Sequence, residues 1–288
     1  MIETQVLLAW PLITAQILIF GTAAFALMTA SSQVAGAANS ADSMVALWRG
    51  LALIILAISP FRFLAVAAGM ADSSMKDAIP FVPQIMRETF AGRVWVWRLG
   101  VTAILALAAW IPVRRILPIV IFAISAVLIL CQSITSHAVD RGASAIAIHF
   151  IHQVAAGLWL GALVGLLVGA TYGRARAEWL EWASERVSMI AGWSVAALVI
   201  TGAIRAWYAL GLHFDLLLYS LYGRTLLWKL ATAASVILIG GYNRYRLVPA
   251  IGEPSARSTL IRNVTAECLL LGAVLGWSAL LGNTPPPH

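Results

Sequence analysis

Eight stretches of this sequence are apolar and long enough to cross a lipid bilayer. Crossing ~30 Å of hydrocarbon takes ~20 residues in a helix, and lipid offers the backbone no hydrogen-bonding partners, so each stretch must be helical. The sequence therefore predicts an all-α polytopic membrane protein, a bundle of eight transmembrane helices. The predicted spans are 5–30, 43–69, 95–112, 116–136, 144–170, 187–210, 222–243 and 259–282.

The charge content excludes most soluble folds and argues against nucleic acid as a partner. Only 11% of the 288 residues are charged, whereas a soluble domain carries about a quarter. The net charge is +7, but the basic residues stand singly near the ends of apolar runs, with no basic helix interleaved with aromatics. The loops are too short for a soluble module, so we expect one transmembrane domain over 1–288.

Arginines in alternate loops set the predicted orientation. The loops after the third, fifth and seventh spans carry Arg114 and Arg115, Arg174 and Arg176, and Arg244 and Arg246. Loops rich in Lys and Arg stay in the cytoplasm, so both termini, the histidine-bearing segments around 137–143 and 211–221, and the loop 70–94 are expected on the periplasmic side. The loop 70–94 obeys this rule only in part, because it carries both basic and acidic residues.

The fifth span carries the most informative stretch, HFIHQVAAGLWLGALVG, residues 149–165. His149 and His152 lie one helical turn apart. Glycines return at every fourth position on another face, a spacing that lets a second membrane helix approach closely. The stripe is Gly157, Gly161, Gly165 and Gly169. The span is therefore predicted to bury two faces, one of which presents His152 above Trp159.

Histidines collect on one side of the predicted topology. An ionisable side chain inside a membrane is costly and usually functional. His149 by itself is better explained as a hydrogen-bonded interior imidazole, whereas His152 has the company of histidines at neighbouring span ends. The candidate metal ligands are His137, His149, His152 and His213, and the last residue, His288, is expected on the same side.

The soft side chains near these histidines favour copper over harder ions. Cys131 lies below His137 in the fourth span, and Met70, Met75 and Met86 lie in the outer loop. Imidazole with thioether or thiolate suits copper, above all Cu(I), while calcium or magnesium would need more oxygen ligands. Ordinary packing explains the methionines equally well.

Several motifs resemble the copper resistance protein D (CopD) family. The longest is SHAVDRGASAIAIHFIHQVAAGLWLGAL, with His137, His152, Trp159 and Gly161 at the family's positions. ETFAGRVWVWRLG, YGRTLLWKLA, NRYRLVP and LGNTPPPH follow the family in the same order. The resemblance covers about 85–288 and, more loosely, the first two spans. His149 is not part of the family pattern.

The resemblance implies a multi-pass protein of the bacterial inner (plasma) membrane that serves copper homeostasis. Such a protein would bind copper at the periplasmic face and move it to the cytoplasm, beside a periplasmic copper-binding partner of the CopC type. The protein would lie in the lipid bilayer. Assembly with a second copy of itself into a homo-oligomer is an open alternative.

Basic residues within the spans leave a second interpretation open. A cation path prefers an acidic lining, yet the outer halves of the spans are net basic. We expect Lys229 to pair with Glu267, the one carboxylate deep in a span. The alternative is a b-type haem held between paired histidines on different helices, with propionates bound by arginines. Those arginines would be Arg98, Arg205 and Arg224.

Catalytic motifs do not point to an enzyme. The sequence contains no Walker loop and no HExxH motif, and it lacks the Gly-x-Ser-x-Gly elbow. The protein would act as a membrane electron carrier only if it bound haem. A third interpretation is a scaffold that assembles partners.

Overall fold

The computed structural model describes residues 2–30, 37–113, 115–136, 139, 141–172, 177–211, 213 and 215–285, and every regular element in them is helical. Eight helices are long and apolar enough to span a membrane. They are α1 (Ile2–Thr29), α2 (Ala37–Met70), α5 (Phe90–Ala108), α6 (Leu117–Ile134), α7 (Ala143–Tyr172), α8 (Ala177–Leu210), α10 (Leu221–Tyr242) and α11 (Pro254–Leu281). The predicted fold class and all eight spans are confirmed.

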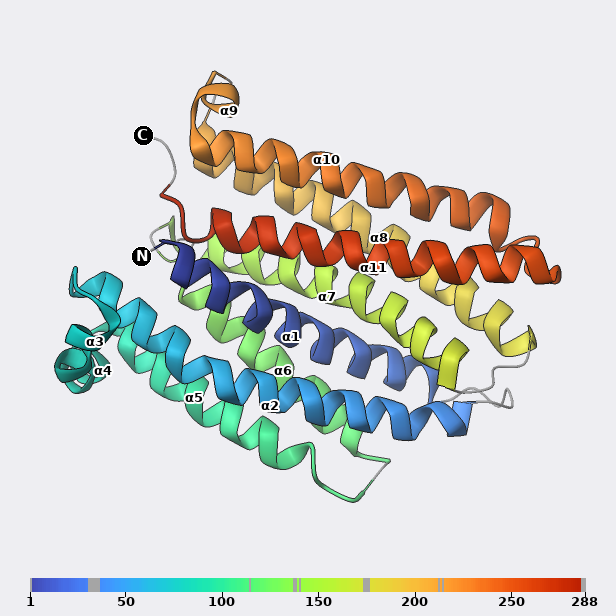
Figure 1. Cartoon of the computed structure of the whole chain (residues 1–288), viewed down its shortest axis with the longest axis horizontal. Coiled ribbons are helices and arrows are strands. Elements are labelled where there is room, and N and C mark those ends of the chain that lie inside the picture. Colours follow the sequence, from blue (N-terminus) through green and yellow to red (C-terminus); the bar gives the residue numbers. More distant parts are fainter. Residues whose placement is uncertain are drawn as a thin grey trace.

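Eight crossings place the start of α1 and the end of α11 at one end of the bundle (Figure 1). We call this the termini end, and the end where α1 finishes the distal end. The termini end also holds the short helices α3 (Met75–Ala78), α4 (Val82–Glu88) and α9 (Leu216–Tyr219), with a 3₁₀ turn over Ile79–Phe81. That the termini end faces the periplasm stays a prediction from the arginine-bearing loops.

The glycine stripe brings α7 against α1, as predicted. A Cβ on Gly161 would lie 2.1 Å from the backbone carbonyl carbon of Gly21, and one on Gly21 would lie 1.8 Å from the carbonyl oxygen of Gly157. Gly165 continues the contact beneath the ring of Phe25. Since no side chain fits between these backbones, glycine is the residue that allows the two helices to pack this closely.

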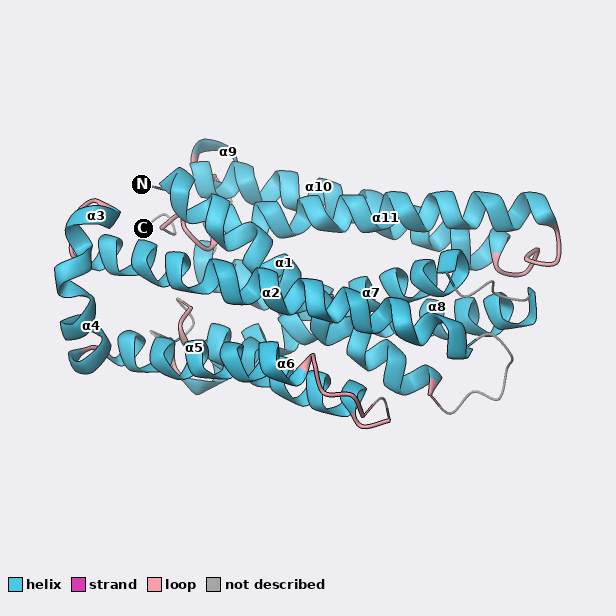
Figure 2. Ribbon diagram, turned by 60° about the horizontal axis from the view of Figure 1, so that its bottom comes forward, coloured by secondary structure: helices cyan, strands magenta, loops and turns pink. Residues whose placement is uncertain are grey.

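The remaining helices surround this central pair (Figure 2). Helices α10 and α11 pack together on one face, and α5 and α6 lie on the opposite face. On α8, Trp179 is buried and its ring fills the space beside Gly169, the last member of the stripe. Large apolar side chains on the outside of α8 and α10, such as Trp193 and Trp228, are exposed where lipid would surround the bundle.

Local signals explain where the helices begin. The third span is longer than its apolar run because α5 begins at Phe90, where the Thr89 hydroxyl accepts a hydrogen bond from Gly92 N at 2.9 Å. Pro60 lies inside α2, which continues through it. Pro118 lies in the first turn of α6, where a missing N–H leaves no helical bond unmade.

Candidate functional site

His152 is anchored by one ring nitrogen, and among the described residues the other has no hydrogen-bond partner. It lies on α7, and its Nδ1 is 2.8 Å from Oγ1 of Thr201 on α8. The Thr201 hydroxyl donates its own hydrogen to the carbonyl oxygen of Ala197 at 2.6 Å, so it accepts from the imidazole. Nδ1 therefore carries the hydrogen, and in the neutral ring Nε2 keeps a lone pair.

His149, one turn earlier on α7, uses both ring nitrogens in hydrogen bonds. Its Nδ1 lies 2.8 Å from Oγ of Ser136, which donates to the carbonyl oxygen of Ser133 at 2.7 Å and therefore accepts from the ring. Nε2 accepts from the side-chain amide of Gln153 at 3.1 Å. This network ties α7 to the end of α6 and occupies both positions at which a metal would bind.

The other two candidate histidines are not seen beside His152. His137 lies outside the described residues, although the residue before it, Ser136, contacts His149. His213 is exposed in the connection between α8 and α9. The part of α8 from Thr201, which bonds to His152, to Leu210 is about 14 Å long at the helical rise. His213 follows Leu210 and therefore lies well beyond the level of His152. In the part of the chain that the structure describes, no three side chains of His, Cys, Asp or Glu lie together in a way that could hold one metal ion.

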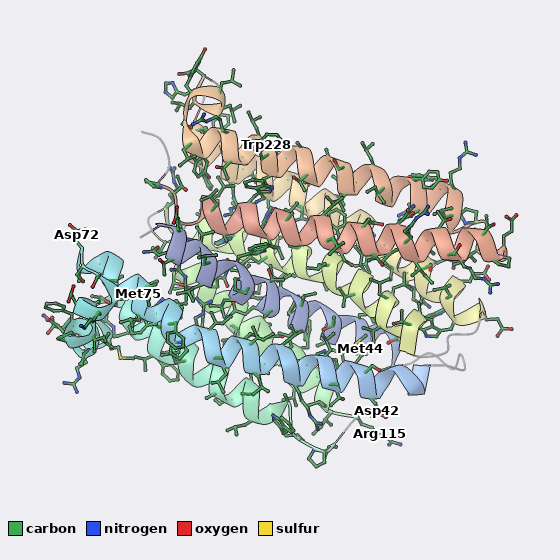
Figure 3. The ribbon with its side chains drawn as sticks, in the orientation of Figure 1. Asp42, Met44, Asp72, Met75, Arg115 and Trp228 are labelled. Carbon is green, nitrogen blue, oxygen red and sulfur yellow. The ribbon has the colours of Figure 1, made fainter. Side chains whose placement is uncertain are left out.

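The soft side chains considered as copper ligands point elsewhere. Cys131 is close enough to Arg98 to interact with it electrostatically, which places it toward α5. Met86 packs against the buried cluster that contains Phe63 and Trp95. Figure 3 shows Met75 at the termini end, in the segment that connects α2 to α5. Met86 therefore has a packing role in that cluster.

Two cations lie near the paired imidazoles. Arg205 is one turn beyond Thr201 on α8, and Lys229 lies on α10; both are half-buried and interact electrostatically with His149 and His152. Arg205 also interacts with Tyr222, at the start of α10. The surroundings of His152 are therefore positively charged, so a ligand ion there must tolerate cationic neighbours.

The three arginines assigned to haem propionates lie in three different settings. Arg205 is beside the imidazoles, whereas Arg224 is exposed at the start of α10. Arg98 is only 4% exposed, donates to the side-chain oxygens of Gln16 and Gln132 at 3.1 and 3.3 Å, and stacks on a tryptophan ring. The described residues therefore provide no shared arginine cluster for one ligand.

The predicted pair between Lys229 and Glu267 is wrong. Glu267 is buried on α11 and accepts a hydrogen bond from the side-chain amide of Asn243, which in turn accepts from Asn263 at 2.8 Å. Asn243 and Lys229 lie on the same helical rod, about 21 Å apart at the helical rise. Because that separation exceeds the reach of both side chains, Glu267 belongs to the distal half and Lys229 to the termini half.

A cavity of about 250 Å³ lies beside Glu267, between α7, α8, α10 and α11. Its lining includes Trp159, Ser184 and Asn243. Asn243 begins a π-helical turn, Asn243–Leu247, that prolongs α10. The sequence signals for this cavity are the single carboxylate in an apolar run and the NRYR segment. The sequence predicts a loop for that segment, whereas the structure shows the π-helical turn.

Comparison with known proteins identifies the family. Residues 1–146 match the model of the copper resistance protein D-like N-terminal domain, and residues 182–281 match the model of copper resistance protein D. The chain belongs to the copper resistance protein D family. The resemblance inferred from its motifs is confirmed, and the chain is a multi-pass copper resistance membrane protein of this family.

Two curated relatives of this copper resistance protein D family member align over most of their length. Copper resistance protein D of Pseudomonas syringae pv. tomato is 27% identical over 260 residues, which cover 82% of each chain. Inner membrane protein YebZ of Escherichia coli (strain K12) is 25% identical over 207 residues, which cover 70% of each chain. No solved structure matches the chain at a comparable level of significance.

Proposed function

We propose that this protein binds copper at the termini end of the bundle through Nε2 of His152 and passes it inward across the bacterial inner membrane. One observation carries the proposal. The Thr201 hydroxyl accepts the Nδ1 hydrogen of His152 and so leaves Nε2 with its lone pair. The family match and the names of both relatives point to copper and to the inner membrane.

The bonding around His152 is the arrangement that metal-ligating histidines need. Such a histidine donates its second N–H to an oxygen, which fixes both the tautomer and the ring orientation. Thr201 supplies that oxygen from α8. By contrast, both nitrogens of His149 are already bonded. We therefore assign His149 a positioning role, since its network holds the end of α6 against the turn of α7 that presents His152.

The neighbouring cations favour the lower oxidation state. Repulsion scales with the charge of the ion, so Arg205 and Lys229 would repel Cu(II) twice as strongly as Cu(I). A neutral imidazole suits Cu(I), and His137 is the candidate for a second ligand, since it follows the Ser136 that bonds to His149. A periplasmic CopC-like protein would deliver the ion, and the chain acts as a carrier without catalytic chemistry.

Inward movement needs no nucleotide. An inside-negative potential favours entry of a cation by ~2.3 kcal/mol per charge per 100 mV. A single charge moving from the termini end to the distal end would therefore gain free energy if the termini end faces the periplasm.

Copper accumulation in cells tests the proposal. We expect His152→Ala to abolish copper uptake that depends on this protein while the variant still inserts in the membrane. His149→Gln is the matched control one turn away, and we expect it to retain uptake because the glutamine amide can still hydrogen-bond to its neighbours. Unchanged uptake by His152→Ala at equal membrane abundance would exclude His152 from the path.

A further inference from the structure

Two arginines are enclosed near the termini end without a carboxylate partner in the described chain. Arg98 on α5 is 4% exposed, and Arg62 on α2 is half-buried. Arg62 donates from Nη2 to the side-chain oxygen of Asn283 at 2.9 Å, and Arg98 donates from its Nη2 to the side chains of Gln16 and Gln132. These acceptors are all neutral amides, and the two guanidinium groups are close enough to repel each other.

The unmet hydrogen-bonding groups here are donors. Among the described residues, four buried polar atoms lack a partner around this pair: Arg62 Nη1, Arg98 Nε, Gln16 Nε2 and Thr102 Oγ1. The three nitrogens can only donate, and the Thr102 hydroxyl can also donate. Because Arg98 only donates, its bond to Gln16 identifies the bonded amide atom as the oxygen, which leaves the amide nitrogen as a buried donor without a partner among the described residues.

The helices bring these donors onto facing surfaces. Thr102 lies four residues after Arg98 on α5, which places both on one face of that helix. Gln16 of α1 bonds directly to Arg98. On α2, Phe63 follows Arg62, and its ring centroid lies 5.6 Å from that of Trp95, the ring over which Arg98 lies. The Arg98 guanidinium is held in place by the Trp95 ring, 4.3 Å from its centroid, and by Gln132 of α6. The donors therefore come from three helices, α1, α2 and α5, while α6 supplies Gln132, which accepts from Arg98.

We propose that a small anion, with chloride as the abundant representative, binds between Arg62 and Arg98. Water could satisfy the hydrogen-bond donors, but only an anion also offsets two positive charges placed in a low-dielectric interior. The anion would accept from Arg98 Nε, Arg62 Nη1 and Gln16 Nε2. This site lies among α1, α2, α5 and α6, separate from His152 and Thr201 on α7 and α8, and it does not depend on the copper proposal.

Thermal unfolding of the purified full-length protein in detergent tests the site. Sodium chloride and sodium bromide are titrated against sodium gluconate at constant ionic strength. We expect the unfolding midpoint to rise saturably with either halide and to stay constant with gluconate, because gluconate is too large for the enclosed donors. A response to formate equal to that of chloride would support the same site with a carboxylate as its occupant.

Variants separate this site from general salt effects. Arg98→Gln is expected to lose the halide response, and Arg62→Gln to weaken it at least tenfold in half-saturating concentration, which keeps the test valid if Arg98→Gln fails to fold. Arg87→Gln, which removes an exposed arginine on α4 at the same end, is the matched control and should keep the response. Absence of a halide-specific rise in the parent protein, or an unchanged half-saturating concentration in Arg62→Gln, would overturn the proposal.

Discussion

The hydroxyl of Thr201 on α8 lies 2.8 Å from Nδ1 of His152 on α7 and accepts its hydrogen. This single bond fixes which nitrogen of a buried imidazole can bind a metal ion. It also couples two helices at the level where we propose that copper binds.

Replacing Thr201 tests whether that bond matters for copper. Thr201→Val keeps the shape of the side chain but removes the acceptor, so the ring loses its fixed tautomer and orientation. We expect Cu(I) affinity to fall about 10–100-fold, the usual effect of losing a metal ligand's supporting partner. The measurement is competition with a chromophoric Cu(I) chelator.

Thr201→Ser serves as the control, because its hydroxyl can accept the same hydrogen and donate to the same carbonyl. It should bind Cu(I) within a few-fold of the parent protein. Equal affinities for the valine and serine variants would show that Thr201 does not position the ligand.

The close packing of α1 on α7 predicts an intolerant glycine. A Cβ on Gly161 would lie 2.1 Å from the Gly21 backbone, so Gly161→Leu must separate the two central helices. We expect loss of monodisperse protein after detergent extraction, measured by size-exclusion chromatography. Gly100→Leu is the matched control, because Gly100 is exposed and a Cβ there meets nothing within 4 Å. A normal elution profile for Gly161→Leu would contradict the packing.

The buried bond between Asn243 and Glu267 predicts a stability effect at the distal half. Asn243→Leu leaves a buried carboxyl group without its donor, and we expect the free energy of unfolding to fall by about 1–3 kcal/mol.

Lys229→Met should leave the effect of Glu267→Gln on the free energy of unfolding unchanged, since sites this far apart behave additively. Reversible unfolding in a denaturing detergent gives the free energies of unfolding of the parent protein, the two single variants and the double variant. A coupling energy well above 0.5 kcal/mol between Lys229 and Glu267 would contradict their separation in the structure.

An absorption spectrum distinguishes copper from haem. In the haem alternative His152 would share the iron with His137 or His213 on the opposite side, but His213 lies well beyond the level of His152, and both nitrogens of His149 are bonded. We expect no Soret band from protein purified from haem-sufficient cells, alongside copper in elemental analysis after loading. A Soret band at one haem per chain would favour the electron-carrier interpretation, with His137 as the second ligand.

The spans and the glycine stripe could be predicted from the sequence because each depends on a local pattern. Apolar length alone fixes a membrane helix, and a four-residue repeat of glycine marks a packing face whatever the partner. Which helix would lie against the stripe could not be predicted, since Gly21 and Phe25 come from a distant span that carries no matching signal.

The roles of the polar residues depended on depth and on partners from other helices. Lys229 and Glu267 lie at similar distances from the starts of the predicted spans 222–243 and 259–282. Because α10 and α11 are antiparallel, similar distances from the starts lead to opposite halves of the membrane. The hydrogen bonds that distinguish His149 from His152 come from α6 and α8. No spacing within the fifth span encodes these partners, so the sequence could not predict which atoms bond to each histidine.

Titration of purified protein with Cu(I) tests the central claim most directly. The parent protein and His149→Gln are expected to compete with the chelator for one copper per chain, with similar affinities. His152→Ala should lose at least a hundredfold in affinity while it keeps the parent elution profile and unfolding midpoint. Tight binding of one copper by a folded His152→Ala variant would contradict the account.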